Sequence, residues 1–207
     1  MRPRILKDEL VLSDYQKEVL IGLLLGDGCL ERSKNSLGAR LKVGQSRKQN
    51  EFAVWLYDIF KEFVQTPPRV KQTKRNGKIY QEVVFNTLTH PCFKSFYEMF
   101  YPTGKKIVPE GIDQFLTPTA LTVWFMSDGS IKSKESRGRI LNTQSFIRSD
   151  IEKLIFILKS KFNLQSSIRT QKDDLQIYIS GKSAESLNAI LKDKILPSFY
   201  YKLPLKG

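Results

Sequence analysis

The stretch Leu20-Ile21-Gly22-Leu23-Leu24-Leu25-Gly26-Asp27-Gly28 is an apolar run that ends in an acid followed by a glycine. A second stretch of the same design, Leu121-Thr122-Val123-Trp124-Phe125-Met126-Ser127-Asp128-Gly129, begins 101 residues later (121 − 20). A run that is apolar on every side is typical of a buried helix. Because each run ends in an acid at the same place, the sequence predicts two pseudo-symmetric halves with a paired carboxylate metal site on their axis.

The charge of the chain restricts its partners. In its 207 residues, 34 Lys and Arg stand against 21 Asp and Glu, which gives a net charge of +13. Such an excess favours a polyanion, with nucleic acid first and an anionic membrane surface second. No apolar run approaches the ~20 residues that a membrane span needs, so we expect no membrane insertion. The charge therefore predicts a nucleic-acid-binding protein.

Cysteine and histidine are scarce. The two cysteines, Cys29 and Cys92, are too few for a zinc site or a secreted disulfide framework, and they indicate a reducing compartment. The single histidine, His90, precedes a proline in a polar turn and is expected to be a loop residue. These counts exclude zinc fingers and histidine-based hydrolases.

Local signals place the elements of the first half. Ser13 and Gln16 form a capping box that predicts the start of the first helix, and Gly26 predicts its end. The Asn-Gly pair at 76–77 predicts a tight hairpin. The other elements expected here are strands at 40–43, 69–71 and 79–87, and helices at 50–64 and 91–100.

The same order of elements is expected again in the second half. Thr117 with Pro118 predicts the start of the second acidic helix, and Ser149 with Glu152 predicts another capping box. The remaining elements are expected as strands at 138–146, 166–171 and 174–180, and helices at 151–163 and 183–195. The fold class is therefore α+β, with duplicated αββαββα halves at 1–103 and 117–207 and a linker at 104–116.

These residues resemble the LAGLIDADG homing endonuclease family. Residues 20–28 match the motif in its first leucine, third glycine, eighth aspartate and ninth glycine, whereas the second copy carries Val123 and Ser127 at the third and seventh positions. The flanking segments Leu116-Thr117-Pro118, Asn142-Thr143-Gln144-Ser145-Phe146 and Tyr201-Lys202-Leu203-Pro204 extend the resemblance over residues 13–205. Two copies are similar to the single-chain branch, which implies a monomer whose two antiparallel sheets form a DNA-binding saddle.

The spacing of the motif suits a metal site. Gly22 and Gly26 are four residues apart on one helix face, so they permit close helix packing that would bring Asp27 and Asp128 together. Divalent cations relieve the repulsion of two adjacent carboxylates, and Mg²⁺ prefers oxygen ligands. We expect Mg²⁺, replaceable by Mn²⁺, on both acids with Gly26 and Ser127 at the helix ends, where it can activate water.

Four further residues are predicted to support catalysis. Lys106 and Lys202 each precede a proline near the end of a half, and the resemblance implies that they orient water or balance phosphate charge. Lys105 is an adjacent rival to Lys106. Gln45 and Gln144 follow the two acids by 18 and 16 residues and are expected to do similar work. The alternative for each lysine is a solvated surface side chain.

DNA recognition is expected to fall to the strands, since a two-stranded ribbon fits the major groove and Arg, Lys, Asn and Gln read base edges there. The residues predicted to bind DNA are Arg40, Lys42, Arg69, Lys71, Lys74, Arg75, Lys78, Arg139, Asn142, Arg169 and Gln171. The alternative is a set of edge strands protected by charge.

The resemblance implies a site-specific endonuclease that hydrolyses both strands of a long, nearly non-palindromic duplex and leaves 3′ overhangs, for intron or intein mobility. It also implies no obligate protein partner, and favours a mitochondrion or plastid over a bacterial cytoplasm. Two alternatives stay open. One is an RNA maturase that binds a group I intron without cutting, and the other is a transcription regulator built on the same fold.

Overall fold

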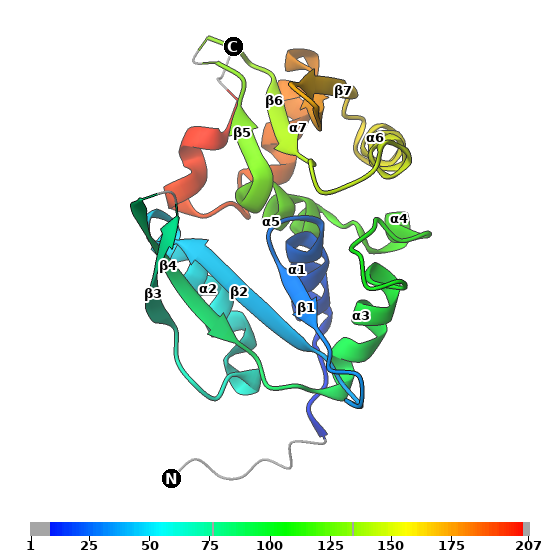
Figure 1. The fold of residues 1–207 in the computed structure, drawn as a ribbon. Helices are drawn as coiled ribbons and strands as arrows, with labels where there is room; N and C mark the ends of the chain where they lie inside the picture. Colours follow the sequence, from blue (N-terminus) through cyan, green and yellow to red (C-terminus); the bar gives the residue numbers. More distant parts are fainter. Residues whose placement is uncertain (1–8, 76, 134, 205–207) are drawn as a thin grey trace. The chain divides into compact units, whose positions relative to one another are not determined.

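The computed structural model describes residues 9–75, 77–133 and 135–204, and it contains two four-stranded antiparallel sheets with helices (Figure 1). The first repeat consists of α1 (Asp14–Leu25), β1 (Cys29–Glu31), β2 (Arg40–Ser46), α2 (Asn50–Phe60), β3 (Arg69–Arg75), β4 (Lys78–Asn86) and α3 (Lys94–Phe100). The second consists of α5 (Pro118–Asp128), β5 (Gly129–Ile131), β6 (Arg139–Asn142), α6 (Arg148–Phe162), β7 (Ser166–Gln171), β8 (Asp174–Ile179) and α7 (Ala184–Leu191). The predicted αββαββα duplication is confirmed.

Helix starts follow the predicted caps in two of three cases. Ser13 Oγ accepts from the N–H of Gln16 at 3.2 Å, and the Gln16 side chain accepts from the N–H of Ser13 at 2.9 Å, which is a capping box. Thr117 Oγ1 accepts from the N–H of Ala120 at 3.2 Å. The box predicted at Ser149 is wrong, because the chain turns into α6 earlier, after the extended residue Ile147 (ψ 161°).

The two sheets share one strand order, β1-β2-β4-β3 and β5-β6-β8-β7. The three-residue strands β1 and β5 were not located by the sequence because they are too short to show alternation. Strand β6 ends at Asn142, four residues before the predicted end at 146, because residues 144–145 form a turn. The predicted hairpin joins β3 to β4 at Gly77, whose φ of 75° suits glycine, while Asn76 lies outside the described residues.

Side chains alternate along β2. Leu41, Val43 and Gln45 are buried on the face that packs against α2, whereas Arg40 and Lys42 are exposed on the other face. This alternation is the period-2 pattern of a strand with one covered face. It leaves the uncovered face of the N-terminal sheet for polar and charged side chains.

The described chain divides into two compact units whose limits differ from the halves of the repeat. One unit holds the residues up to 17 together with 27–99, and the other holds 18–26 together with the residues from 100 onward. Helix α1 therefore contributes to both units. In the second unit α5 is surrounded by protein, with every residue from Ala120 to Met126 buried.

Two smaller points complete the fold. The linker contains a short helix, α4 (Ile112–Phe115), and a 3₁₀ segment, η6 (Pro197–Lys202), follows α7. Histidine 90 is buried, and its Nδ1 accepts from the N–H of Cys92 at 3.2 Å, so it caps a turn. Within the described ranges, every helix is too short or too polar to cross a bilayer.

Candidate functional site

The end of α1 packs against α5 through glycine. A Cβ atom on Gly22 would lie 2.4 Å from the carbonyl oxygen of Ala120 and 2.7 Å from the Cβ of Val123. A Cβ on Gly26 would lie 2.7 Å from the Cβ of Ser127. Real side chains do not approach so closely, so only glycine fits at both positions. Valine at position 123 is accommodated because the residue opposite it is glycine.

The two motif acids stand in different local structure. Helix α5 includes Asp128 as its last residue, whereas α1 ends at Leu25 and leaves Asp27 in the turn that follows. Asp27 is exposed and Asp128 is half-buried. A Cβ on Gly26 would lie 3.4 Å from Oδ2 of Asp128, so that carboxylate lies beside the residue bonded directly to Asp27.

Both predicted lysines reach the ends of the motif helices. Lys106 Nζ donates to the carbonyl oxygen of Gly26 at 2.7 Å, and Lys202 Nζ donates to that of Met126 at 2.6 Å. The structure separates Lys106 from its rival, because Lys105 is exposed and Lys106 is half-buried. A cation at a helix C-terminus complements the negative end of the helix dipole. The lysines thus place positive charge at the C-terminal end of each motif run.

The two lysines are not equivalent. Gly26 precedes Asp27 by one residue, whereas Met126 precedes Asp128 by two. Lys202 is also the more enclosed, since it is 5% exposed and its Nζ lies 4.8 Å from the ring centre of Phe199. The arrangement at the two helix ends is therefore asymmetric.

The two predicted glutamines lie in unlike places. Gln45 is buried on the covered face of its sheet, and Gln144 is exposed in a turn. Cys29 and Ser130, each two residues after a motif acid, pair with Lys42 and Ile140 respectively. Gln45 lies three residues after Lys42, and Thr143 lies three residues after Ile140, so Gln45 and Thr143 occupy equivalent positions in the two repeats. The predicted equivalence of Gln45 and Gln144 is therefore wrong, and buried Thr143 takes that position.

A line of polar side chains leads away from Asp128. Asn142 Nδ2 donates to the carbonyl oxygen of Asp128 at 2.8 Å, and its Oδ1 accepts from Gln176 Nε2 at 2.8 Å. Gln176 Oε1 in turn accepts from Arg169 Nη1 at 3.1 Å. Sequence reasoning missed Gln176, although a buried glutamine between Leu175 and Ile177 in a strand is a recognisable signal. These contacts bring predicted DNA-binding residues Asn142 and Arg169 into one network.

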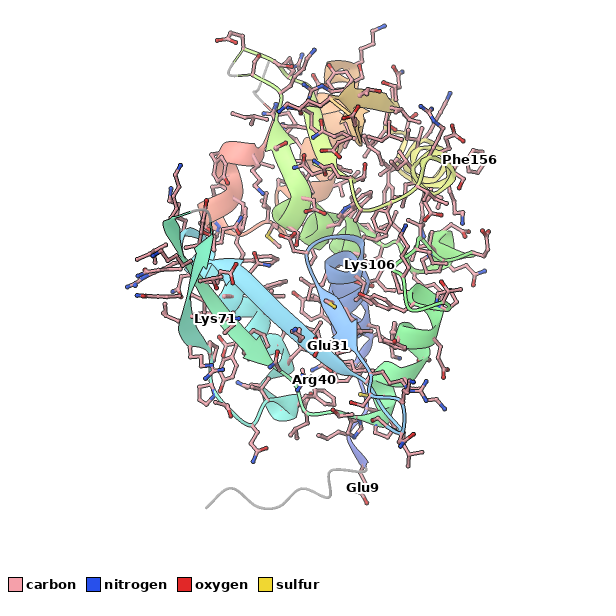
Figure 2. The ribbon with its side chains drawn as sticks, in the orientation of Figure 1. Glu9, Glu31, Arg40, Lys71, Lys106 and Phe156 are labelled. Carbon is pink, nitrogen blue, oxygen red and sulfur yellow. The ribbon has the colours of Figure 1, made fainter. Side chains whose placement is uncertain are left out.

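An acid organises the uncovered face of the N-terminal sheet. Glu31 Oε2 accepts from Arg40 Nη2 at 2.7 Å, and its Oε1 accepts from Lys42 Nζ at 2.6 Å. These hydrogen bonds, that from Lys42 first, hold the pKa of Glu31 below its usual value of 4.5. Glu31 was not predicted, because the sequence alone does not pair β1 with β2. Figure 2 labels Glu31, Arg40 and Lys71 on this sheet.

The same face carries a groove and most of the remaining predicted DNA contacts. A groove of about 430 Å³ is lined by Asp27, Arg40, Lys42, Arg69 and Lys71. Lys74 and Lys78 are exposed near the hairpin, and Gln171 is exposed on β7. Arg75 belongs to β3, but its side chain lies outside the described part of the chain.

Arg139 does not join this set. Its side chain is 2% exposed, and its Nε donates to the carbonyl oxygen of Lys202 at 2.6 Å. Its two terminal nitrogens donate to the carbonyls of Ser136, Gly138 and Leu203. A buried guanidinium whose donors are engaged in this way cannot read DNA bases. The prediction that Arg139 binds DNA is therefore replaced by a role inside the protein.

The residues at the helix ends suit a hard divalent cation. The hydroxyl oxygen of Ser127 is buried without a hydrogen-bond partner in the described chain, next to the carboxylate of Asp128. Oxygen donors of this kind, with backbone carbonyls, are the ligands that Mg²⁺ takes. Among the described residues, no group of three or more His, Cys, Asp or Glu side chains is placed to hold a metal.

Comparison with known proteins agrees with this arrangement. The chain is 32% identical over 192 residues to cytochrome b mRNA maturase bI2 of Debaryomyces hansenii, covering 90% of this chain and 72% of that protein. It is 31% identical over 198 residues to a probable intron-encoded endonuclease of Wickerhamomyces canadensis, covering 93% and 85%.

The fold is also similar to a solved structure. The homing endonuclease I-WcaI bound to its DNA recognition sequence matches with a TM-score of 0.90 and 29% identity, over 96% of this chain and 89% of that one. The profile of the LAGLIDADG DNA endonuclease family matches residues 17–187. Repeated motif, duplicated fold and relatives thus agree, and the chain belongs to the LAGLIDADG DNA endonuclease family.

Proposed function

We propose that this protein is a site-specific homing endonuclease that hydrolyses both strands of a long, nearly non-palindromic DNA duplex. In this proposal it works as a monomer with Mg²⁺, or Mn²⁺ in its place, leaves 3′ overhangs and promotes intron mobility, in a mitochondrion or another organelle. The observation that carries the proposal is the carboxylate of Asp128 beside Gly26, the residue bonded to Asp27. The similarity to a DNA-bound homing endonuclease supports the substrate class.

The division of labour follows from the geometry. Asp27 and Asp128 would hold the cations, with the free oxygen positions filled by backbone carbonyls, water and phosphate. Divalent metal supplies a Lewis acid that activates water and stabilises the leaving oxygen. Lys106 and Lys202 would keep positive charge at the helix ends, beside developing negative charge on the phosphates.

DNA would lie against the uncovered faces of the two sheets. Arg40 and Lys42 both donate hydrogen bonds to the Glu31 carboxylate, which therefore orients their side chains. Fixed donors suit base reading, since bidentate hydrogen bonds to guanine need a defined geometry. The exposed lysines of the hairpin, Lys74 and Lys78, would grip phosphates without reading sequence.

A second candidate is an RNA maturase that assists group I intron splicing by binding without cleavage. One specific observation favours it: the 32% identity to a protein named a cytochrome b mRNA maturase. The presence of both motif acids favours cleavage, because binding alone does not need paired carboxylates. The two activities can be separated by substrate.

A cleavage assay tests the proposal. A randomised duplex library is incubated with the protein and Mg²⁺, cut products are selected, and the recovered target is then used with Mg²⁺, with EDTA and with group I intron RNA. We expect a double-strand cut with 3′ overhangs that EDTA abolishes. Asp27→Asn and Asp128→Asn should each abolish the double-strand cut while target binding persists.

Asp113→Asn is a matched control, since it removes one exposed carboxylate from the short helix α4, which lies outside both motifs. It should cut at the parent rate. Splicing assistance by a protein that fails to cut any duplex would support the maturase instead, and near-parent cleavage by either motif variant would contradict the paired-acid site.

A further inference from the structure

We infer that Arg139 is a positioning residue for Lys202, holding from inside the protein the backbone that carries this lysine. The inference deepens the proposed function, on which the catalytic role of Lys202 rests. It concerns residues of one compact unit, since Arg139, Lys202 and the end of α5 all lie in the part of the chain from residue 100 onward.

The contacts join Arg139 to the two peptide groups that flank the end of η6. Nε donates to the carbonyl oxygen of Lys202 at 2.6 Å, and Nη2 donates to that of Leu203. From the same residue, Lys202 Nζ reaches back to the carbonyl of Met126 at 2.6 Å. Arg139 therefore fixes the backbone of the residue whose side chain caps α5.

The other end of the guanidinium is anchored as well. Nη1 donates at 2.8 Å to the carbonyl oxygens of Ser136 and Gly138, which precede β6. The planar fork of an arginine can bind several carbonyls at once in fixed directions, which a lysine cannot do. The guanidinium thus ties the chain before β6 to the end of η6.

An arginine at this position is unexpected for packing. Lys42 and Ile140 are equivalent, because they pair with Cys29 and Ser130, each two residues after a motif acid. Arg139 precedes Ile140 as Leu41 precedes Lys42, so Arg139 takes the place of Leu41 in the second repeat. Leu41 is fully buried and belongs to the core. A charged side chain buried at a core position is costly unless its donors are used. Its four hydrogen bonds to carbonyls offset that cost and at the same time place Lys202.

The chain near the matching lysine of the first motif is held by a different contact. Lys106 lies in the linker, where the N–H of Val108 donates to Asp150 Oδ2 at 3.0 Å. The Asp150 carboxylate thus holds the chain near Lys106, whereas the Arg139 guanidinium holds the chain at Lys202. Loss of Arg139 should therefore slow cleavage at the phosphate nearest Lys202 more than cleavage at the phosphate nearest Lys106.

Strand-resolved kinetics test the inference. The target is labelled on each strand separately, and single-turnover cleavage is followed for the parent, Arg139→Gln, Arg139→Lys, Lys202→Ala and the double variant Arg139→Gln/Lys202→Ala. We expect Arg139→Gln to slow one strand about tenfold, as loss of a supporting partner commonly does, and to slow the same strand as Lys202→Ala. In the Lys202→Ala background it should add no further slowing.

Two measurements keep the test independent of folding and of activity. Arg148→Lys, at an exposed arginine on α6, is the matched control and should cleave like the parent. Acetylation of lysines, read by mass spectrometry, should rise at Lys202 relative to Lys106 in Arg139→Gln, because Lys202 is only 5% exposed in the parent.

Several results would overturn the inference. The first is that Arg139→Gln slows cleavage of both strands equally. The second is that Arg139→Gln slows cleavage as much in the Lys202→Ala background as it does alone. The third is an unchanged ratio of Lys202 to Lys106 acetylation. If Arg139→Gln does not fold, the same comparisons apply to Arg139→Lys, which keeps the charge and loses the fork. A parent protein that cuts no duplex would contradict the proposed function, and the acetylation ratio would still decide whether Arg139 places Lys202.

Discussion

Gly22 of α1 and Val123 of α5 lie so close that a Cβ on Gly22 would stand 2.7 Å from the Cβ of Val123. The second motif thus carries a side chain where the first carries none. Close packing at this point needs a glycine on one helix only. The helix contact is therefore asymmetric from its middle to its end, where Gly26 faces Ser127.

Gly22→Ala should destabilise the protein by about 1–3 kcal/mol, because the new methyl group overlaps the Ala120 carbonyl and forces the helices apart. Urea unfolding measures the change. Gly44→Ala is the matched control, since the nearest atom to its new Cβ is 3.7 Å away. Equal stability of both variants would show that the helices have room to spare.

Lys106→Ala and Lys202→Ala should each slow cleavage by at least about tenfold, an effect of ~1.4 kcal/mol on the barrier. The two variants should slow the two strands unequally, because the lysines cap different carbonyls, those of Gly26 and Met126. Supercoiled, nicked and linear plasmid are followed over time, and nicked DNA should accumulate transiently. Conversion at the parent rate without extra nicked species would mean that these lysines cap the helix ends without taking part in cleavage.

Glu31→Gln should strengthen binding to random DNA while weakening discrimination of the target. It removes a negative charge from the sheet face that we propose to contact DNA, and it frees Arg40 and Lys42 from their hydrogen bonds to Glu31. Equilibrium binding to target and random duplexes measures the ratio. Glu152→Gln changes the charge equally at an exposed site on α6 and should leave the ratio unchanged. Identical ratios for the two variants would deny Glu31 a role in specificity.

The same carboxylate sets a pH limit. Because the pKa of Glu31 is lowered in the folded protein, its ion pairs are fully present above the ordinary value of 4.5. They are lost only as pH falls through the lowered pKa. Discrimination of the target should therefore not fall between neutral pH and about pH 5 through protonation of Glu31.

Binding should weaken steeply with salt, with log K falling by ~0.9 for each phosphate neutralised. The net charge of +13 is the reason for this expectation. Titrations between ~50 and ~200 mM salt with target and random duplexes give the slope. A nearly flat response would remove nucleic acid as the main partner.

Cys92 should be slow to react with thiol reagents. Burial raises the pKa of its thiol from 9.0 to about 12, and the thiolate is the reactive form. In Cys29→Ser, the remaining thiol should react on the order of a thousandfold more slowly in the folded protein than in urea at the same pH. Stability should also fall as pH rises from 9.0 toward 12, because the unfolded thiol ionises first. Equal rates folded and unfolded would show that the thiol is exposed.

Repetition and capping could be read from the sequence because they depend on neighbouring residues. The Ser13–Gln16 box, the Thr117 cap and the hairpin that joins β3 to β4 are local, and each lies where it was predicted. The placement of the two lysines at the helix ends could be predicted only from the family resemblance. Glu31 could not be predicted, since its partners Arg40 and Lys42 lie on another strand.

The error at Arg139 has a single geometric cause. Cys29 pairs with Lys42, 13 residues on (42 − 29), whereas Ser130 pairs with Ile140, 10 residues on (140 − 130). The second hairpin is thus tighter by three residues. Side chains alternate between the two faces of a sheet, so an odd difference in loop length reverses the face expected for a residue from its distance to the motif acid. Arg139 turns inward for this reason, and motif spacing alone does not reveal such a shift.

The division of helix α1 between two compact units restricts how halves of related chains can be exchanged. Residues 18–26 pack with the C-terminal unit, although they belong to the N-terminal repeat. A chimera joined in the linker would set Gly22 and Gly26 against a foreign α5, whose residues at 120, 123 and 127 evolved opposite another helix. A workable exchange keeps 18–26 with the residues from 100 onward, so that recombination needs three junctions, after 17, after 26 and near 99.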